Sequence, residues 1–243
     1  MLIFPAEVHP ISDAKPCLSP LLLLHLAPFS FLLGVSVAHL ISEPRRLRSQ
    51  RVLLLAHGAG APMDSDYMNF MANSISDAGV KVVRFEFPYM DRRRHTGKKS
   101  PPDRMPKLID CFNDVVQQYG GPDRCIAGGK SMGGRVASLM LAENQVAAAI
   151  SLGYPFHPPG KQDKVRGDHW PQIKAPWLIV QGTRDAFGKL EEVMDYPLPH
   201  SAVLRWLEDG DHDFKPRKAS GLTQPQHWQQ AAEWAAEFII GLD

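Results

Sequence analysis

The chain of 243 residues is long for one domain, yet it falls within the range that a single α/β domain can fill. Its 27 Lys and Arg against 26 Asp and Glu leave a formal net charge of +1, so there is no global electrostatic reason to expect nucleic-acid binding. A hydrophobic content of 44% with 22% charged residues excludes a disordered chain and a polytopic membrane protein. The three cysteines lack C-x-x-C spacing, which argues against a disulfide framework and favours a reducing compartment such as the cytoplasm.

An uncharged apolar run near the N-terminus needs separate treatment. Leu18–Ile41 is long enough for a membrane-spanning helix, but Pro20 and Pro28 would interrupt it. The arginines that follow, at 45, 46, 48 and 51, would keep the rest of the chain in the cytosol even if the run inserted. We expect residues 1–50 to form an appendage. A flap packed on the domain or a mis-assigned translation start is favoured over membrane contact through residues 18–41.

From Arg51 onward, short apolar runs alternate with helical patterns, which is typical of a mostly parallel sheet with helices on both faces. The expected strands are Val52–Ala56, Val82–Phe87, Arg124–Ala127, Val146–Leu152, Trp177–Gln181 and Val203–Leu207. The expected helices cover Asp64–Ala78, Leu108–Tyr119, Met132–Glu143 and a last segment that begins at Pro225. The sequence therefore predicts one α/β domain over residues 51–243.

A G-x-S-x-G motif, from Gly129 to Gly133, lies between an expected strand and an expected helix. A serine on such a sharp turn adopts strained backbone angles, and side chains at the glycine positions would collide across the turn. The turn exposes the hydroxyl above the end of the sheet. We therefore expect Ser131 to be a nucleophile, although a serine that only caps the helix is the alternative.

A nucleophilic serine needs a base and a group that orients the base. Asp185 follows the strand Trp177–Gln181, and His212 follows the strand Val203–Leu207. Because the carboxyl ends of parallel strands meet at one edge of a sheet, we expect Ser131, Asp185 and His212 to lie together there as a catalytic triad. Asp209, Asp211 and Asp213 are expected to serve only the loop around the histidine.

The oxyanion of an acyl-transfer reaction needs backbone N–H donors. The expected donors are those of Met132, directly after the nucleophile, and Ala59, in the His-Gly-Ala-Gly loop after the first strand. His57 in that loop is expected to be structural. No histidine spacing typical of a metal site occurs, and we expect neither a metal nor a cofactor.

Taken together, LLLAHGAGAPMDSDYM, VVRFEFPYM, GGKSMGGR, QGTRDAFG and DGDHDF resemble the α/β-hydrolase fold superfamily over about residues 51–242. Within it they resemble the small dienelactone-hydrolase-like group that includes the KANL/Tex type of hydrolase-like domain. The resemblance implies the same triad and the same oxyanion donors. Only 24 residues separate Leu152 from Trp177, too few for a helical lid, so an open site is expected.

A basic run follows the strand Val82–Phe87, with five positive charges between Arg92 and Lys99. Arg92, Arg93 and Arg94 are candidates for holding a substrate carboxylate or phosphate, with a solvated loop as the favoured alternative. Tyr154 is a candidate for lining an acyl pocket, and packing in the core explains it equally well.

These features predict a serine hydrolase that cleaves a small ester or thioester through an acyl-enzyme. Two alternatives remain: a catalytically idle scaffold for protein interaction, and an acyltransferase on the same fold. The sequence predicts a small-molecule substrate and no nucleic-acid partner, and it leaves the oligomeric state undetermined.

Overall fold

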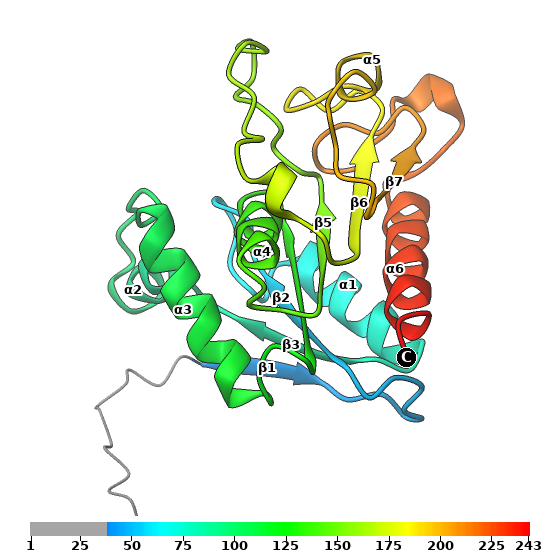
Figure 1. Cartoon of the computed structure of the whole chain (residues 1–243). Coiled ribbons are helices and arrows are strands. Elements are labelled where there is room, and N and C mark those ends of the chain that lie inside the picture. The colour runs from blue at the N-terminus through cyan, green and yellow to red at the C-terminus, as the bar shows by residue number, and fades with distance from the viewer. Residues whose placement is uncertain (1–37) are drawn as a thin grey trace, which may run out of the picture. The chain divides into compact units, whose positions relative to one another are not determined.

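The computed structural model describes residues 38–243, in which a seven-stranded sheet has the order β1-β3-β2-β4-β5-β6-β7 (Figure 1). β1 pairs antiparallel with β3, and all other neighbours are parallel. The strands are β1 (His39–Ser42), β2 (Val52–Ala56), β3 (Lys81–Phe85), β4 (Cys125–Lys130), β5 (Ala148–Leu152), β6 (Trp177–Gly182) and β7 (Ala202–Leu207). The expected α/β-hydrolase fold, a mostly parallel sheet with helices on both faces, is confirmed.

Helices cover the two faces of the sheet. They are α1 (Asp66–Asp77), α2 (Pro88–Thr96), α3 (Met105–Gln118), α4 (Met132–Ala142), α5 (Leu190–Val193) and α6 (Gln224–Ile240). In the view of Figure 1, α3 and α4 lie in front of the sheet, and α1 lies behind it. Two short 3-10 turns complete the secondary structure, η1 (Trp170–Gln172) and η2 (Lys218–Ser220).

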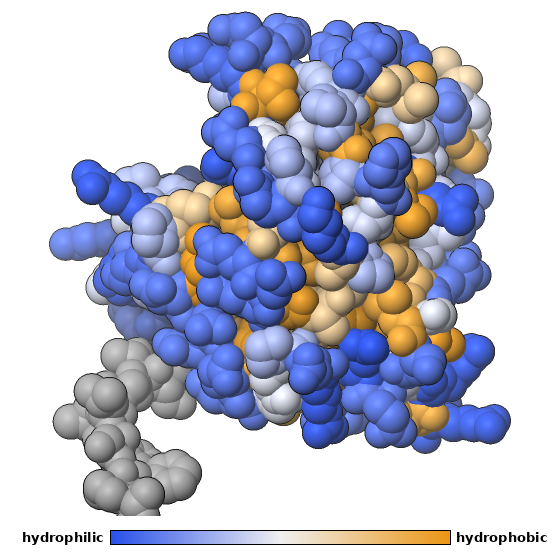
Figure 2. Space-filling model, in the orientation of Figure 1, coloured by the Kyte–Doolittle hydropathy of each residue, from blue (hydrophilic) through white to orange (hydrophobic). Residues whose placement is uncertain are grey.

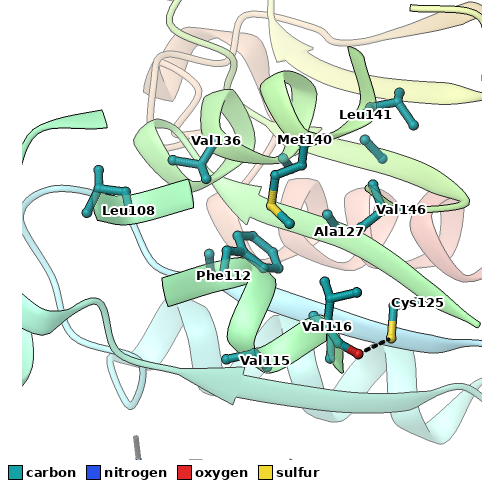
Figure 3. Close-up of a cluster of buried hydrophobic side chains, with 14 of the residues drawn as sticks. Leu108, Phe112, Val115, Val116, Cys125, Ala127, Val136, Met140, Leu141 and Val146 are labelled. Atoms are coloured by element: carbon teal, nitrogen blue, oxygen red, sulfur yellow. Dashed lines mark hydrogen bonds between the residues drawn. The ribbon is translucent and has the colours of Figure 1, made fainter. Parts of the chain in front are cut away.

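β2 explains why the sheet separates two apolar layers. All five of its residues are buried, because a parallel strand covered on both faces has no solvent side. Leu54 faces the cluster formed with α3 and α4, whereas Leu53 and Leu55 face the cluster formed with α1 and α6. Figure 3 shows part of the first cluster, where Phe112 lies close to Met140.

The surface of the face shown in Figure 2 is largely hydrophilic, with apolar side chains between the polar ones. Among residues 38–243, no helix combines the length and apolar character needed to cross a membrane. Residues 18–37 of the apolar run lie outside the described residues.

Two elements differ from expectation at the N-terminal side of the sheet. β1 lies within the stretch expected to be an appendage, yet it is part of the sheet, with His39 opposite Phe85 and Ser42 opposite Val82. The expected strand 82–87 ends at Phe85, because Glu86 and Phe87 lead into α2.

The basic run was expected to be a loop, and this expectation is wrong for its first half, which belongs to α2. Pro88 occupies the first turn of that helix, and Gly97 ends it with a left-handed φ of 69°. The connection from Leu152 to Trp177 holds only the turn η1, so no lid interrupts the domain there.

Candidate active site

Ser131 lies in the turn between β4 and α4 with a φ of 50° and a ψ of −110°. A positive φ is costly for a residue with a side chain, and it persists only where the surroundings fix it. The Ser131 backbone N–H donates to the Leu152 carbonyl at 2.9 Å, which ties the turn to the end of β5. The turn therefore holds the Ser131 hydroxyl at the carboxyl end of the sheet.

Gly129 and Gly133 let this turn close. A Cβ on Gly133 would lie 2.7 Å from the Ala56 carbonyl oxygen and 2.8 Å from that of His57. A Cβ on Gly129 would lie 2.5 Å from the Gly133 carbonyl carbon. Both glycines are thus required by the close approach of backbone to backbone.

The three residues expected to form a triad are joined by hydrogen bonds. Ser131 Oγ lies 2.9 Å from His212 Nε2, and His212 Nδ1 lies 2.8 Å from Asp185 Oδ2. Because a carboxylate only accepts, the His212 proton belongs on Nδ1, which leaves Nε2 to accept from the Ser131 hydroxyl. The arrangement can transfer a proton from the serine to the imidazole.

Asp185 is fully buried, and its carboxylate is well supplied with donors. Gln181 Nε2 donates to Oδ2 at 2.9 Å, and the Phe187 backbone N–H donates to Oδ1 at 2.8 Å. The Phe187 ring also packs against the His212 imidazole, with ring centroids 4.3 Å apart. These donors hold the carboxylate in the orientation in which it accepts from the imidazole.

The loop after β2 holds Ala59 in a defined orientation. The carbonyl oxygen of Gly58, which belongs to the same peptide group as the Ala59 N–H, accepts from His57 Nδ1 at 2.7 Å and from the Tyr89 hydroxyl at 3.3 Å. In a trans peptide the C=O and the N–H point in opposite directions, and the described residues contain no cis peptide bond. Holding the Gly58 oxygen therefore fixes the direction of the Ala59 N–H.

His57 acts in the loop as expected, as a structural residue. Burial lowers the pKa of its imidazole below the usual value, which favours the neutral form. Its Nε2 accepts from the Phe87 N–H at 3.1 Å, so the proton lies on Nδ1, which donates to Gly58. One histidine thus links the loop to the start of α2.

A cavity of about 490 Å³ opens beside Ser131 and His212. Its lining residues are Gly58, Ala59, Gly60, Ala61, Ser65, Tyr67, Met68, Lys130, Ser131, Phe187, His212, Asp213, Gln224 and Trp228. This volume is within the range of small-molecule sites. Among residues 38–243, no group of His, Cys, Asp and Glu side chains is arranged to hold a metal ion.

The candidate substrate-binding arginines lie elsewhere. Arg92 pairs with Asp103 at 2.9 Å, and Arg93 donates to the Gly60 carbonyl at 3.2 Å. Arg94 bonds Asp64 and the buried Glu86. None of the three arginines lines the cavity beside Ser131. Instead, Arg93 and Arg94 brace the loop that carries Ala59.

Tyr154 lies in the core rather than in the cavity. It is fully buried, and its ring packs edge-on against Phe156 and Trp177, with ring centroids 4.8 and 5.3 Å away. Its hydroxyl donates to the Arg166 carbonyl at 3.3 Å. Of the two explanations left open for this residue, the structure places it in core packing.

Motif reasoning missed the contacts of Lys130, which occupies the variable position before the serine. Its ammonium donates to the His212 carbonyl oxygen at 2.6 Å and lies 3.5 Å from Asp213. Burial lowers the pKa of Lys130, while Asp213 acts in the opposite direction. The residue next to the serine therefore anchors the loop that carries the histidine.

Comparison with known proteins agrees with this architecture. Residues 49–240 match a family model described as an alpha/beta hydrolase domain. Among solved structures, Est1E from Butyrivibrio proteoclasticus has a TM-score of 0.63 at 15% identity, with 84% of this chain and 93% of that chain covered. An a/b serine hydrolase without lid from Xanthomonas campestris has a TM-score of 0.57 at 21% identity, covering 81% and 87%. A dienelactone hydrolase from Anabaena variabilis has a TM-score of 0.57 at 20% identity, covering 82% and 90%.

Proposed function

Because the chain belongs to the alpha/beta hydrolase domain family, we propose that it is a serine hydrolase that cleaves a small ester or thioester through an acyl-enzyme. The observation that carries the proposal is the hydrogen-bonded chain from Ser131 through His212 to Asp185, with the serine on a strained turn beside a cavity. The resemblance of the sequence motifs to those of dienelactone-hydrolase-like proteins and of KANL/Tex-type domains supports the same chemistry.

In the first half of the reaction, the Ser131 oxygen attacks the substrate carbonyl carbon while His212 Nε2 takes the hydroxyl proton. The carbonyl π electrons move onto oxygen, which accepts hydrogen bonds from the Ala59 and Met132 N–H groups. His212 then gives the proton to the leaving alcohol or thiol, and the acyl group stays on Ser131.

In the second half, water replaces the alcohol. The water oxygen attacks the acyl carbon while His212 takes a proton from that water. The collapse of the second oxyanion then releases the carboxylic acid from Ser131. The proton returns to the Ser131 oxygen. Asp185 accepts from His212 Nδ1 and stabilises the imidazolium in both halves.

The test is steady-state hydrolysis of 4-nitrophenyl and CoA esters of graded acyl length by the wild-type chain and by Ser131→Ala. We expect Ser131→Ala to lower kcat by at least about 10⁴-fold, because the nucleophile and its base act as a unit. Thermal melting of both proteins controls for folding. Equal turnover by the two proteins, or no turnover of any ester by the folded wild type, would contradict the proposal.

A further inference from the structure

The cavity beside Ser131 has an aromatic wall that is already assembled. The Tyr67 ring packs edge-on against the Trp228 ring at 5.3 Å, and the Trp228 ring packs on Phe70 at 5.5 Å. Trp228 Nε1 donates to the Asp213 carbonyl at 3.3 Å, which fixes the indole from its polar edge. With buried Met68 beside Tyr67, this wall joins the N-terminal parts of α1 and α6. It offers an apolar surface in the cavity that Phe187 also lines.

Within residues 38–243, the one cation that lines the cavity is already paired and is not free to bind a substrate. Of the lining residues in the described part of the chain, the charged side chains are Lys130 and Asp213, with His212 titratable. Lys130 is committed to the His212 carbonyl and to Asp213. The Asp213 side chain is 76% exposed and therefore presents a negative charge at the cavity's solvent side.

The basic run does not supply the missing cation. Arg93 and Arg94 line a separate, smaller cavity of about 220 Å³ together with Glu86. Their guanidinium groups are held by the Gly60 carbonyl and by the carboxylates of Asp64 and Glu86. An anionic substrate at Ser131 would therefore meet Asp213 without a free arginine to compensate.

We propose that this site selects uncharged esters whose acyl part carries an aryl or compact hydrocarbon group, which packs on Tyr67, Met68 and Trp228, and that it discriminates against esters carrying a carboxylate. The inference rests on the serine-hydrolase function proposed above and names its substrate class. Aromatic walls bind such groups by apolar contact and by edge-to-face geometry, whereas a carboxylate there would lose water without gaining a partner.

The charge preference is tested with two substrates that share the six-carbon adipoyl chain, 4-nitrophenyl methyl adipate and 4-nitrophenyl hydrogen adipate, which differ in the methyl group that caps the second carboxylate. We expect the wild-type chain to have a kcat/KM at least about 10-fold higher for the uncharged ester, since a buried anion without a partner is disfavoured. Asp213→Asn removes the negative charge and should lower the kcat/KM ratio of the uncharged to the charged ester by about threefold or more. Because the ratio compares two substrates on one enzyme, a general loss of activity in the variant cancels.

The apolar wall is tested with 4-nitrophenyl phenylacetate and acetate. Trp228→Ala should lower the kcat/KM ratio of phenylacetate to acetate by about 10-fold, because it removes the surface against which the ring packs. Trp234→Ala is the matched control on α6, outside the cavity, and should leave the ratio within about twofold of wild type.

The outcomes separate this inference from the function it rests on. Ser131-dependent turnover with equal or greater kcat/KM for hydrogen adipate overturns the inference and leaves the function standing. A ratio of phenylacetate to acetate that Trp228→Ala and Trp234→Ala change equally also overturns it. Absence of any Ser131-dependent turnover overturns both.

Discussion

Two neighbouring arginines on α2 provide a matched pair for testing how the loop around Ala59 is held. Arg94 donates to both oxygens of Glu86, at 2.9 Å and 2.5 Å, and the Glu86 side chain is only 2% exposed. Without Arg94, the nearest remaining donor to this carboxylate among residues 38–243 is the Met63 N–H at 3.4 Å. Arg92 instead forms a pair with Asp103 in which the arginine is 49% exposed.

Removing one partner of a buried ion pair costs about 3–5 kcal/mol. Arg94 is 40% exposed, so solvent replaces part of what is lost, and we expect Arg94→Met to lower the free energy of unfolding by about 2 kcal/mol. For a domain of this size that corresponds to a fall in Tm of about 4–8 °C. Arg92→Met leaves Asp103, which is 14% exposed, with Lys107 at 3.4 Å as a remaining partner, so this variant should cost less, about 1 kcal/mol.

Urea unfolding at pH 7 measures both values, and the kcat of the same proteins reports on the loop. Arg94→Met should also lower kcat more than Arg92→Met does, because Arg94 anchors Asp64 at the end of the loop that carries Ala59. Equal losses of stability in the two variants would refute the reasoning that Glu86 depends on Arg94.

Three further predictions concern the turn, the histidine loop and pH. Gly133→Ala should destabilise the fold by about 1–3 kcal/mol in urea unfolding, whereas Gly60→Ala, with nothing within 4 Å of an added Cβ, should change it by less than about 0.5 kcal/mol; similar losses would contradict the close approach. Lys130→Met should lower kcat by about 10-fold or more with little change in KM, because the His212 carbonyl loses its anchor, and an unchanged kcat would argue against that role. Burial lowers the pKa of His169 from 6.5 to about 4, so the unfolded chain takes up the proton first and stability should fall as pH drops from about 6.5 to about 4. The free energy of unfolding in urea should be about 1 kcal/mol lower at pH 5 than at pH 7, a value already discounted for the partial exposure of His169. His169→Gln should make this difference smaller. The same pH dependence in the variant and the wild type would exclude His169 as its source.

The sequence was sufficient to place the three candidate catalytic side chains at one edge of the sheet. Ser131, Asp185 and His212 each follow a strand of the expected sheet, and parallel strands bring their carboxyl ends together. The close contacts at Gly133 likewise follow from the turn that the motif predicts. Local pattern and global topology agree in this part of the chain.

Elements without apolar periodicity were harder to predict. α2 carries charges around much of its surface, so only Pro88 and Gly97 signalled its ends. β1 is four residues long and continues an apolar run, which hid its role as an edge strand. Short or strongly charged elements owe their structure to neighbours that a local pattern does not contain.

The roles of individual polar residues depended on partners that are distant in sequence. Arg94 donates a hydrogen bond to Asp64, 30 positions away, and Lys130 donates one to the His212 carbonyl, 82 positions away. Without knowledge of those partners, the basic run from Arg92 to Lys99 is easily interpreted as a binding site for an anionic substrate. The sequence could therefore indicate the candidate catalytic residues but not the residues that hold them in place.

The central claim, that Ser131 is an activated nucleophile, is tested most directly by covalent labelling. The folded wild-type chain would be treated with a fluorophosphonate probe and examined by intact mass and by peptide mapping. The account predicts one adduct per chain, on Ser131, absent from Ser131→Ala and strongly slowed in His212→Ala. An unlabelled wild type, or equal labelling of Ser131→Ala, would contradict it.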